Sequence, residues 1–492
     1  MNDTIRRVGI AMLALFLAIA AQLSYLQLVR ADELESDPGN VRVFIKDLNR
    51  PRGAILSADG VLLAESVPSE DDGDDFDLQR RYPPETATLF AHVVGYQSVN
   101  FGNTGVEAAY NGDLVGRRTP SSAGDVIDLL SGEDLRGNVV LTLSARAQAT
   151  ARDGLADRRG SVVVLDVATG AIVAAYSNPS YDPNFLASHD VDLASAAFQL
   201  INEGDRPGLA RAWREIYAPG STFKVATASI ALEAGVTSLD APVYPEIREL
   251  DLPQTNDTLE NFGGSSCGGN LVASFRRSCN TTFGQVGLDL GETLAERMPD
   301  FGINTQPPPT DLRPGVARSA GPQPGSFELN QPTFAQAAIG QNAVAVTPLG
   351  MAMIAQAVAN GGEMLVPHVL DHVETVNGEV IAPSRFQPAR YRSTMRPETA
   401  ATVRDLMVEV VNNGTGTNAQ IPGIQVAGKT GTAQVEGNDA PHAWFIGFAP
   451  AEAPRYAIAV LVEHGGDLGS EATGGRVAAP IAASVLQALL QA

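Results

Sequence analysis

Lysine is nearly absent from this chain of 492 residues, in which only three of the 34 basic residues are lysines and the other 31 are arginines. Codon composition explains such a bias, but the bias also has a chemical consequence. An arginine guanidinium stays protonated in proteins, whereas a buried lysine ammonium can lose its proton. Each retained lysine, Lys46, Lys224 and Lys429, is therefore a candidate for proton-transfer chemistry.

Positive charge is scarce as a whole, because 56 acidic residues oppose the 34 basic ones and give a formal net charge of −22. A chain of this sign repels a phosphate backbone, and so nucleic acid is excluded as an expected partner. Glycine and proline, at 48 and 31 residues, stay well below the share that marks low-complexity sequence. The length, about three times that of a typical domain, predicts two or three globular units.

Cysteine occurs only at Cys267 and Cys279, 12 residues apart. Two thiols are too few for a disulfide framework or a four-ligand zinc site, and they either form one bond outside the cytoplasm or are unrelated. His368 and His372 have the i, i+4 spacing of a metalloprotease helix, but no glutamate stands between them and Pro367 indicates a strand. The sequence therefore predicts no metal site and no cofactor.

Residues 8–29 form an uncharged run of 22 residues directly after Arg6 and Arg7. As a helix this run spans about 33 Å, enough to cross a hydrocarbon core of about 30 Å. Arginines before the run and acidic residues after it predict a cytoplasmic tail over residues 1–7 and an extracytoplasmic remainder. The alternative is a signal peptide cleaved after Ala18-Ile19-Ala20, but apolar residues continue past that site and favour an uncleaved transmembrane anchor.

Residues 30–150 contain short apolar runs separated by turns, which predicts a mixed, β-rich domain. Asp59-Gly60, between two of these runs, indicates a hairpin. Six acidic residues lie between positions 70 and 77. They lack the ligand spacing of a calcium loop and predict a solvated excursion.

Residues 155–492 predict a second, larger domain, in which strands at both ends enclose a helical middle. An apolar hairpin around Thr169-Gly170 opens this domain, and a mostly apolar helix is expected from Ser221 to Ala234. Short connections between the late strands predict a mostly antiparallel five-stranded sheet flanked by helices, an α/β fold of the α+β type. The late elements are strands at 424–435, 444–449 and 456–463 and a closing helix at 477–490.

Two of the three lysines belong to short polar motifs. Ser221 and Lys224 stand three residues apart at the start of the apolar helix, so their side chains lie on one face. Because Glu233 at the far end is the only other charge in this helix, desolvation favours a neutral amine that can accept the serine proton. Ser-Cys-Asn follows at 278–280, and Lys-Thr-Gly-Thr follows at 429–432.

In this order, Ser-x-x-Lys, Ser-x-Asn and Lys-Thr-Gly form the signature of penicillin-recognising serine acyltransferases. The chain resembles a class B penicillin-binding protein of the penicillin-binding protein A type. This family has one membrane anchor, a pedestal or dimerisation-like domain and a transpeptidase domain. No glycosyltransferase segment fits between anchor and pedestal, which argues against the bifunctional class. Further matches are Arg52-Gly53-Ala54-Ile55, Tyr181-Asp182-Pro183-Asn184, Gly340-Gln341, Thr347-Pro348-Leu349, Ala359-Asn360-Gly361-Gly362, Gly414-Thr415-Gly416-Thr417 and Ala443-Trp444-Phe445.

The resemblance implies a peptidoglycan D,D-transpeptidase that cross-links stem peptides through a serine acyl-enzyme. Ser221 would be the nucleophile and Lys224 the base that activates it. Ser278 and Lys429 would relay the proton toward the leaving amine. Asn280 would hold the amide of the substrate's side chain.

The resemblance also implies which residues bind the substrate's carboxylate and the oxyanion. Lys429, Thr430 and Thr432 would bind the terminal carboxylate, and the backbone N–H groups of Ser221 and Thr432 would form the oxyanion hole. Gly431 would let the substrate lie against the strand. One departure from the family pattern, Ser57-Ala58-Asp59-Gly60 in place of the more common Asp-Arg-Asn-Gly, concerns contacts of the pedestal.

The implied partners are peptidoglycan stem peptides, β-lactams as covalent inhibitors, the membrane, a separate glycosyltransferase, and division or elongation proteins. The alternatives are a D,D-carboxypeptidase or β-lactamase-like hydrolase, and a non-catalytic cell-wall scaffold. A class A β-lactamase needs a Glu-x-x-Leu-Asn segment that this sequence lacks, and a scaffold would show a damaged motif. Residues 264–268 match Gly-x-Ser-x-Gly, but no apolar strand precedes them as that hydrolase motif requires.

Overall fold

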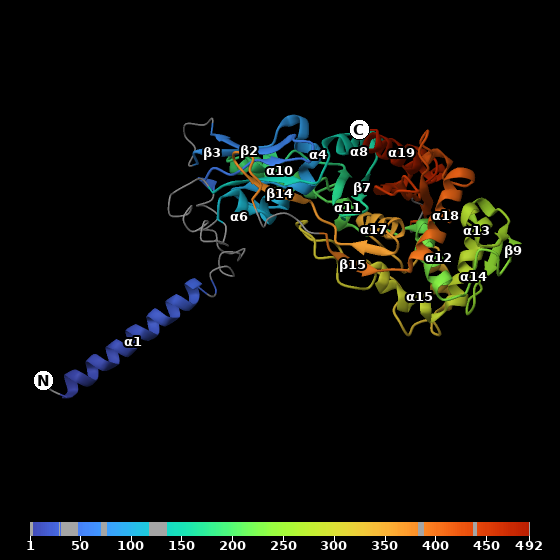
Figure 1. Ribbon diagram of the computed structural model, residues 1–492, viewed down its shortest axis with the longest axis horizontal. Helices are drawn as coiled ribbons and strands as arrows, with labels where there is room; N and C mark the ends of the chain where they lie inside the picture. Colours follow the sequence, from blue (N-terminus) through green and yellow to red (C-terminus); the bar gives the residue numbers. More distant parts are fainter. Residues whose placement is uncertain are drawn as a thin grey trace. The chain divides into compact units, whose positions relative to one another are not determined.

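The computed structural model describes residues 3–28, 30, 48–69, 76–117, 135–381, 388–435 and 440–491. These residues belong to two compact units, one of Met1–Pro51 with Pro68–Gln79 and one of Arg52–Val67 with Arg80–Ala492 (Figure 1). Lys46 and most of the acidic segment expected at 70–77 lie outside the described residues.

The first unit contains the helix α1 (Asp3–Leu28), which confirms the apolar helix expected near the N-terminus. Between Ile5 and Leu26 this helix is long and apolar enough to cross a membrane, and none of that stretch is buried in the structure. The helix ends at Leu28, and Val29 lies outside the described residues. A single-pass membrane protein is consistent with this helix.

The second unit is built on the predicted five-stranded antiparallel sheet, in which the hairpin of the early strands lies beside the late strands. The strand β18 joins the two groups, since it pairs with β17 on one side and with β7 on the other. The order of the strands is β16 (Ala427–Ala433), β17 (His442–Ala449), β18 (Tyr456–Val462), β7 (Gly160–Asp166) and β8 (Ile172–Asn178).

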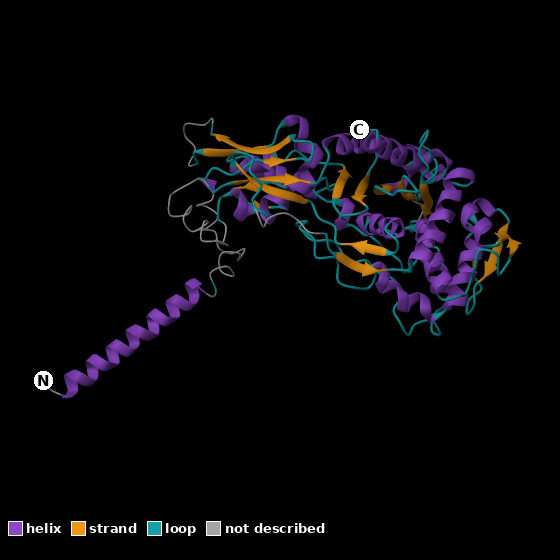
Figure 2. Ribbon diagram, viewed as in Figure 1, coloured by secondary structure: helices purple, strands orange, loops and turns teal. Residues whose placement is uncertain are grey.

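Helices cover both faces of this sheet, because nearly every residue of β7, β17 and β18 is buried regardless of the face to which it points (Figure 2). The helix α17 (Pro348–Ala359) packs on β7, β17 and β18, whereas α19 (Ala478–Leu490) and α8 (Ala145–Leu155) pack on β8, β17 and β18. The closing helix is therefore confirmed. The edge strand β16 remains free on one side for the residues of the site.

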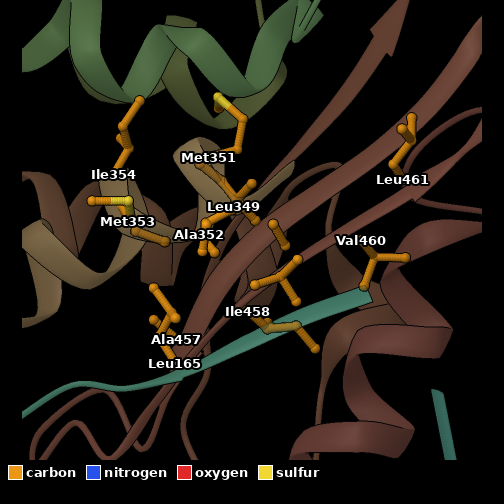
Figure 3. Packing of buried hydrophobic residues seen from close by; sticks show 14 of the residues in the cluster. Leu165, Leu349, Met351, Ala352, Met353, Ile354, Ala457, Ile458, Val460 and Leu461 are labelled. Atoms are coloured by element: carbon orange, nitrogen blue, oxygen red, sulfur yellow. The ribbon is translucent and has the colours of Figure 1, made fainter. Parts of the chain in front are cut away.

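The core between α17 and the sheet consists of unbranched and branched apolar side chains in direct contact. Figure 3 shows Leu349 and Ala352 of α17 near Ala457 and Ile458 of β18. All four are at most 1% exposed. Burying one side chain of the size of Leu or Ile contributes about 1.5–3 kcal/mol to stability, and so this packing holds the sheet rigidly under the site.

The helices in the middle of the larger domain carry residues of the site at their ends. Its main helices are α9 (Asn184–Ala187), α10 (Val191–Asn202), α11 (Arg211–Arg214), α12 (Lys224–Glu233), α13 (Leu271–Arg277), α14 (Asn280–Leu290), α15 (Glu292–Arg297), α16 (Gln331–Ala338) and α18 (Pro397–Asn413). Its short strands are β9 (Tyr244–Ile247), β10 (Glu249–Asp251), β11 (Thr258–Glu260), β12 (Cys267–Gly269), β13 (Glu363–Leu365) and β15 (Arg390–Ser393).

The expected hairpin at Asp59-Gly60 is present, between β1 (Ile55–Leu56) and β2 (Leu62–Pro68). Its turn contacts the start of α8, because the Asp59 carboxylate accepts the backbone N–H of Ala145 at 3.0 Å. Burial alone would raise the pKa of Asp59, but this bond and one from Ser57 lower it. An anion at a helix N-terminus is favourable. Asp59, in the turn that departs from the family pattern, therefore has a structural role.

A strand from the larger domain completes the sheet of the pedestal. The strand β6 (Gly137–Leu141) runs parallel to β1, and β14 (Leu370–Thr375) pairs with β6 in antiparallel register. The pedestal was expected within residues 30–150, but β14 adds to its sheet a segment from far along the chain. Other pedestal elements are β3 (Leu78–Arg81), α4 (Pro84–Val94), β4 (Gln97–Ser98), β5 (Gly102–Asn103), α5 (Gly105–Ala109) and α6 (Asn111–Leu114).

Two arginines and one glutamate form a buried ionic cluster in the pedestal. Glu107 is fully buried and accepts hydrogen bonds from Arg52 Nη2 at 2.8 Å and from Arg80 Nε at 2.6 Å. Burial alone would raise the pKa of Glu107, but Arg80 and Arg52 hold that pKa below its ordinary value. The cluster ties the start of the pedestal to α5.

We predict that Glu107→Gln destabilises the protein by about 3–5 kcal/mol, because two buried guanidinium groups would lose their counter-ion. Urea unfolding of the detergent-solubilised protein measures the change. The matched control is Glu65→Gln, which breaks the exposed pair with Arg81 and should change stability by less than about 1 kcal/mol.

The pH dependence of the free energy of unfolding provides a second check on the contribution of Glu107. Because the folded-state pKa of Glu107 is lowered, its contribution is fully present above the ordinary pKa of a glutamate and is lost as pH falls through the folded-state pKa. Equal urea unfolding midpoints for Glu107→Gln and Glu65→Gln would contradict the stabilising role of the buried ionic cluster.

Candidate active site

Ser221 lies in a 3₁₀ turn, Gly220–Phe223, that leads directly into α12. The regular helix therefore begins at Lys224 rather than at Ser221. Residues i and i+3 of a 3₁₀ turn eclipse one another, so the turn places Ser221 and Lys224 on the same side. Gly220 has a φ of 53°, and a Cβ there would lie 2.8 Å from the carbonyl oxygen of Thr432. Only glycine permits this turn to approach the edge strand β16 so closely.

Lys224 is fully buried and points toward the Ser-Cys-Asn motif. Its Nζ donates to the carbonyl oxygen of Ser278 and to Oδ1 of Asn280, both at 2.8 Å, and lies 3.4 Å from Oγ of Ser278. Among the described residues no hydrogen bond joins the Ser221 hydroxyl to this amine. The structure thus brings the first and second motifs together through Lys224.

Lys429 reaches the same serine from the opposite side. Its Nζ donates to Oγ of Ser278 at 2.8 Å and to the carbonyl oxygen of Thr430 at 3.1 Å. Lys429 is the third residue of β16 and is also fully buried. The Ser278 hydroxyl therefore lies between the two lysines that the sequence retained inside its motifs.

Burial lowers the pKa of both amines. The pKa of Lys224 is well below its ordinary value because of desolvation and the nearby charge of Lys429. Desolvation lowers the pKa of Lys429 to about 7. Lys429 can therefore gain and lose a proton near neutral pH, which the ordinary lysine side chain does not do.

Ser278 lies at the junction of α13 and α14 in an unusual backbone conformation. Its φ of 60° and ψ of 42° fall in the left-handed region, where non-glycine residues are uncommon. Strain of this kind persists only when the surrounding structure fixes it. The next residue, Cys279, forms a disulfide with Cys267 in β12, which decides the alternative that the sequence left open.

The sequence analysis did not single out Asn261, although this side chain fixes the start of α14. Its Oδ1 accepts the backbone N–H of Asn280 at 2.8 Å and that of Thr281 at 3.1 Å. Asn280 itself donates from Nδ2 to the carbonyl oxygen of Glu260 at 2.9 Å. Oδ1 of Asn280 accepts from Lys224, and the Nδ2 group has a second N–H with which it can donate to a ligand.

The segment Lys429-Thr430-Gly431-Thr432 forms the middle of the edge strand β16. A Cβ at Gly431 would lie 2.9 Å from the carbonyl oxygen of Pro219, so glycine is required here for contact with the turn of Ser221. Oγ1 of Thr430 lies 2.5 Å from Oγ1 of Thr415, a residue that the sequence analysis noted only as part of a family match. Because Gly431 lies so close to Pro219, the third motif adjoins the first through backbone contacts.

The competing motifs do not form sites. Ser265 is exposed, follows a 3₁₀ turn and precedes β12, which reverses the strand-then-helix order of the hydrolase motif. His372 lies in the strand β14, as Pro367 indicated, and His368 forms a bridge with Ala171 before it. Within the described part of the chain no cluster of three His, Cys, Asp or Glu side chains is suited to a metal ion.

Two family descriptions match this chain. Residues 160–487 match the penicillin binding protein transpeptidase domain, and residues 52–140 match the penicillin binding protein A dimerisation domain. The first of these matches contains all three motifs of the site.

Individual relatives agree with these matches. The chain is 40% identical to the peptidoglycan D,D-transpeptidase PbpA of Mycolicibacterium smegmatis, over 100% of this chain and 99% of the relative. It is 39% identical to PbpA of Mycobacterium tuberculosis, with the same coverage. The fold resembles penicillin-binding protein A from M. tuberculosis in its ceftriaxone acyl-enzyme complex, with a TM-score of 0.82 and 36% identity over 91% of this chain and 100% of that one. The penicillin G acyl-enzyme complex of that protein has a TM-score of 0.80 and 38% identity, over 90% and 100%.

Proposed function

The chain belongs to the penicillin-binding protein transpeptidase family, and from this premise we propose that it is a peptidoglycan D,D-transpeptidase that works through a serine acyl-enzyme. The observation that carries the proposal is the Ser278 hydroxyl, placed between Lys224 and Lys429 beside the turn of Ser221. β-Lactams are covalent inhibitors of such an enzyme, in keeping with the acyl-enzyme complexes of the similar structures.

In the first step, Oγ of Ser221 attacks the carbonyl carbon of the penultimate D-alanine of a donor stem peptide. Lys224, whose pKa is well below its ordinary value because of burial, accepts the serine proton. The oxyanion that forms accepts hydrogen bonds from the backbone N–H groups of Ser221 and Thr432. A single donor of this kind stabilises a transition state by about 3–4 kcal/mol in other enzymes. The close approach of Gly220 to Thr432 supports this pairing of donors.

Collapse of the tetrahedral intermediate breaks the peptide bond and needs a proton on the leaving amine. Ser278 can pass a proton from Lys224 or Lys429 to that amine, because its hydroxyl contacts both ammonium groups. Terminal D-alanine then departs and leaves the ester on Ser221. The amine of a second stem peptide attacks this ester and forms the cross-linking peptide bond. The bond between the acyl carbon and Oγ of Ser221 breaks, and the proton of the amine passes through the same groups to Oγ of Ser221.

The substrate is held at two other points. Lys429, Thr430 and Thr432 bind its terminal carboxylate with positive charge and hydroxyl donors. The free N–H of the Asn280 amide binds a carbonyl oxygen of the stem peptide, and the disulfide at Cys279 keeps this amide in place. No cofactor takes part in this scheme.

The cell-wall setting of the enzyme follows from its substrate. Cross-linking requires glycan strands, and so we propose a separate glycosyltransferase and division or elongation proteins as its partners. We also propose that the N-terminus is cytoplasmic and that the catalytic domain lies outside the cytoplasm, because Arg6 and Arg7 precede the apolar helix.

Ser221→Ala should abolish covalent labelling by fluorescent penicillin, because the variant lacks the hydroxyl that forms the proposed ester. Labelling of the purified protein followed by peptide mapping measures the effect. Ser265→Ala, in the competing Gly-x-Ser-x-Gly segment, is the matched control and should label normally. Labelling that persists in the Ser221 variant would overturn the assignment of the nucleophile.

Lys224→Arg should lower the rate constant of penicillin acylation about 100- to 10,000-fold, since an arginine cannot act as the base. Lys429→Arg should lower it far less, because arginine still supplies positive charge toward the carboxylate. Stopped-flow acylation of the two folded variants measures both constants. If the acylation rate constant of Lys224→Arg falls by less than about tenfold, Lys224 is excluded as the base.

A reporter that is active only outside the cytoplasm, fused after Ala492, should be active in cells. The intact fusion should remain in the membrane fraction, because the apolar helix is retained as an anchor. A soluble form that begins near Ala21 would show instead that the helix is a cleaved signal sequence.

A further inference from the structure

A second hydroxyl group is in hydrogen-bonding contact with Thr430, the proposed carboxylate-binding residue. Thr430 is buried, with 6% of its surface exposed, and its Oγ1 lies 2.5 Å from Oγ1 of Thr415. Thr415 is exposed and belongs to the Gly-Thr-Gly-Thr loop that follows α18. None of the roles proposed above uses this residue.

The loop holds Thr415 in a fixed place. The backbone N–H groups of Gly414 and Gly416 both donate to the carbonyl oxygen of Val410, at 3.1 and 3.0 Å. On the other side, a Cβ at Gly475 would lie only 2.3 Å from the carbonyl oxygen of Thr415. The backbone of Thr415 is thus held by α18 and lies against Gly475, which keeps this residue beside Thr430.

The direction of the bond between the two hydroxyl groups decides what Thr430 can do. A hydroxyl has one proton to donate and two lone pairs that accept. If Thr430 donates to Thr415, its proton is no longer available for a substrate. If Thr415 donates, Thr430 keeps its own proton for a substrate oxygen. A carboxylate can only accept, and so its presence selects the second arrangement.

We propose that Thr415 is a positioning residue for substrate recognition: its hydroxyl donates to Oγ1 of Thr430 and directs the proton of Thr430 toward the terminal carboxylate of the substrate. Hydrogen bonds in such a chain polarise and strengthen one another. A bond to an ionised acceptor is about twice as strong as a bond to a neutral one, so the pair favours a charged carboxylate over an ester. The proposal rests on the proposed function.

The test compares benzylpenicillin with its methyl ester, which lacks the negative charge. Second-order acylation rate constants are measured by stopped flow with the full chain in detergent. Thr415→Val should lower the constant for benzylpenicillin about tenfold, the size expected for one lost hydrogen bond in such a chain. The constant for the methyl ester should stay the same, because the ester does not depend on the charge-assisted bond.

Two variants separate positioning from a structural effect. Thr415→Ser keeps the hydroxyl and should restore the preference for the charged compound. Thr417→Val changes an exposed threonine of the same loop and should behave as the unmodified protein. Equal losses for both penicillins in Thr415→Val, or no loss for either, would overturn the proposal. Failure of the proposed function has a different signature, since penicillin would then still label Ser221→Ala.

Discussion

The arrangement of the candidate active site depends on the contact that two buried lysines make with one hydroxyl group. Ser278 receives a hydrogen bond from Lys429 at 2.8 Å and lies 3.4 Å from the amine of Lys224. Burial lowers the pKa of both amines, and the charge of Lys429 lowers the pKa of Lys224 further. With its pKa lowered to about 7, Lys429 can exchange a proton with the Ser278 hydroxyl near neutral pH.

The rest of the structure keeps that contact in place. The sheet and α17 form a packed base, and the edge strand β16 delivers Lys429. The disulfide from Cys267 and the amide of Asn261 fix the junction that carries Ser278. Glycine at Gly220 lets the turn of Ser221 meet the strand. Each support comes from a different part of the chain, so the site exists only in the folded domain.

Much of the fold could be predicted because its signals are local. The hairpin around Thr169-Gly170, the late strands and the closing helix each show a pattern within about 20 residues. A strand near Pro367 was expected, but its place in the pedestal sheet showed no local signal, because β14 pairs there with β6, more than 200 positions earlier. The buried Glu107 was missed for the same reason, since Arg52 and Arg80 reach it from separate segments.

The sequence by itself determined the motifs of the candidate site: a serine three residues before a lysine, a second serine, and a second retained lysine in an arginine-rich chain, after an apolar N-terminal segment. These features follow from residue type and spacing, which a sequence states directly. The tertiary structure alone decided that Cys267 and Cys279 are bonded, that Asn261 holds the start of α14, and that Thr415 touches Thr430. Each of these depends on distances of a few ångströms between distant segments, and folding sets those distances, whereas composition and periodicity do not encode them.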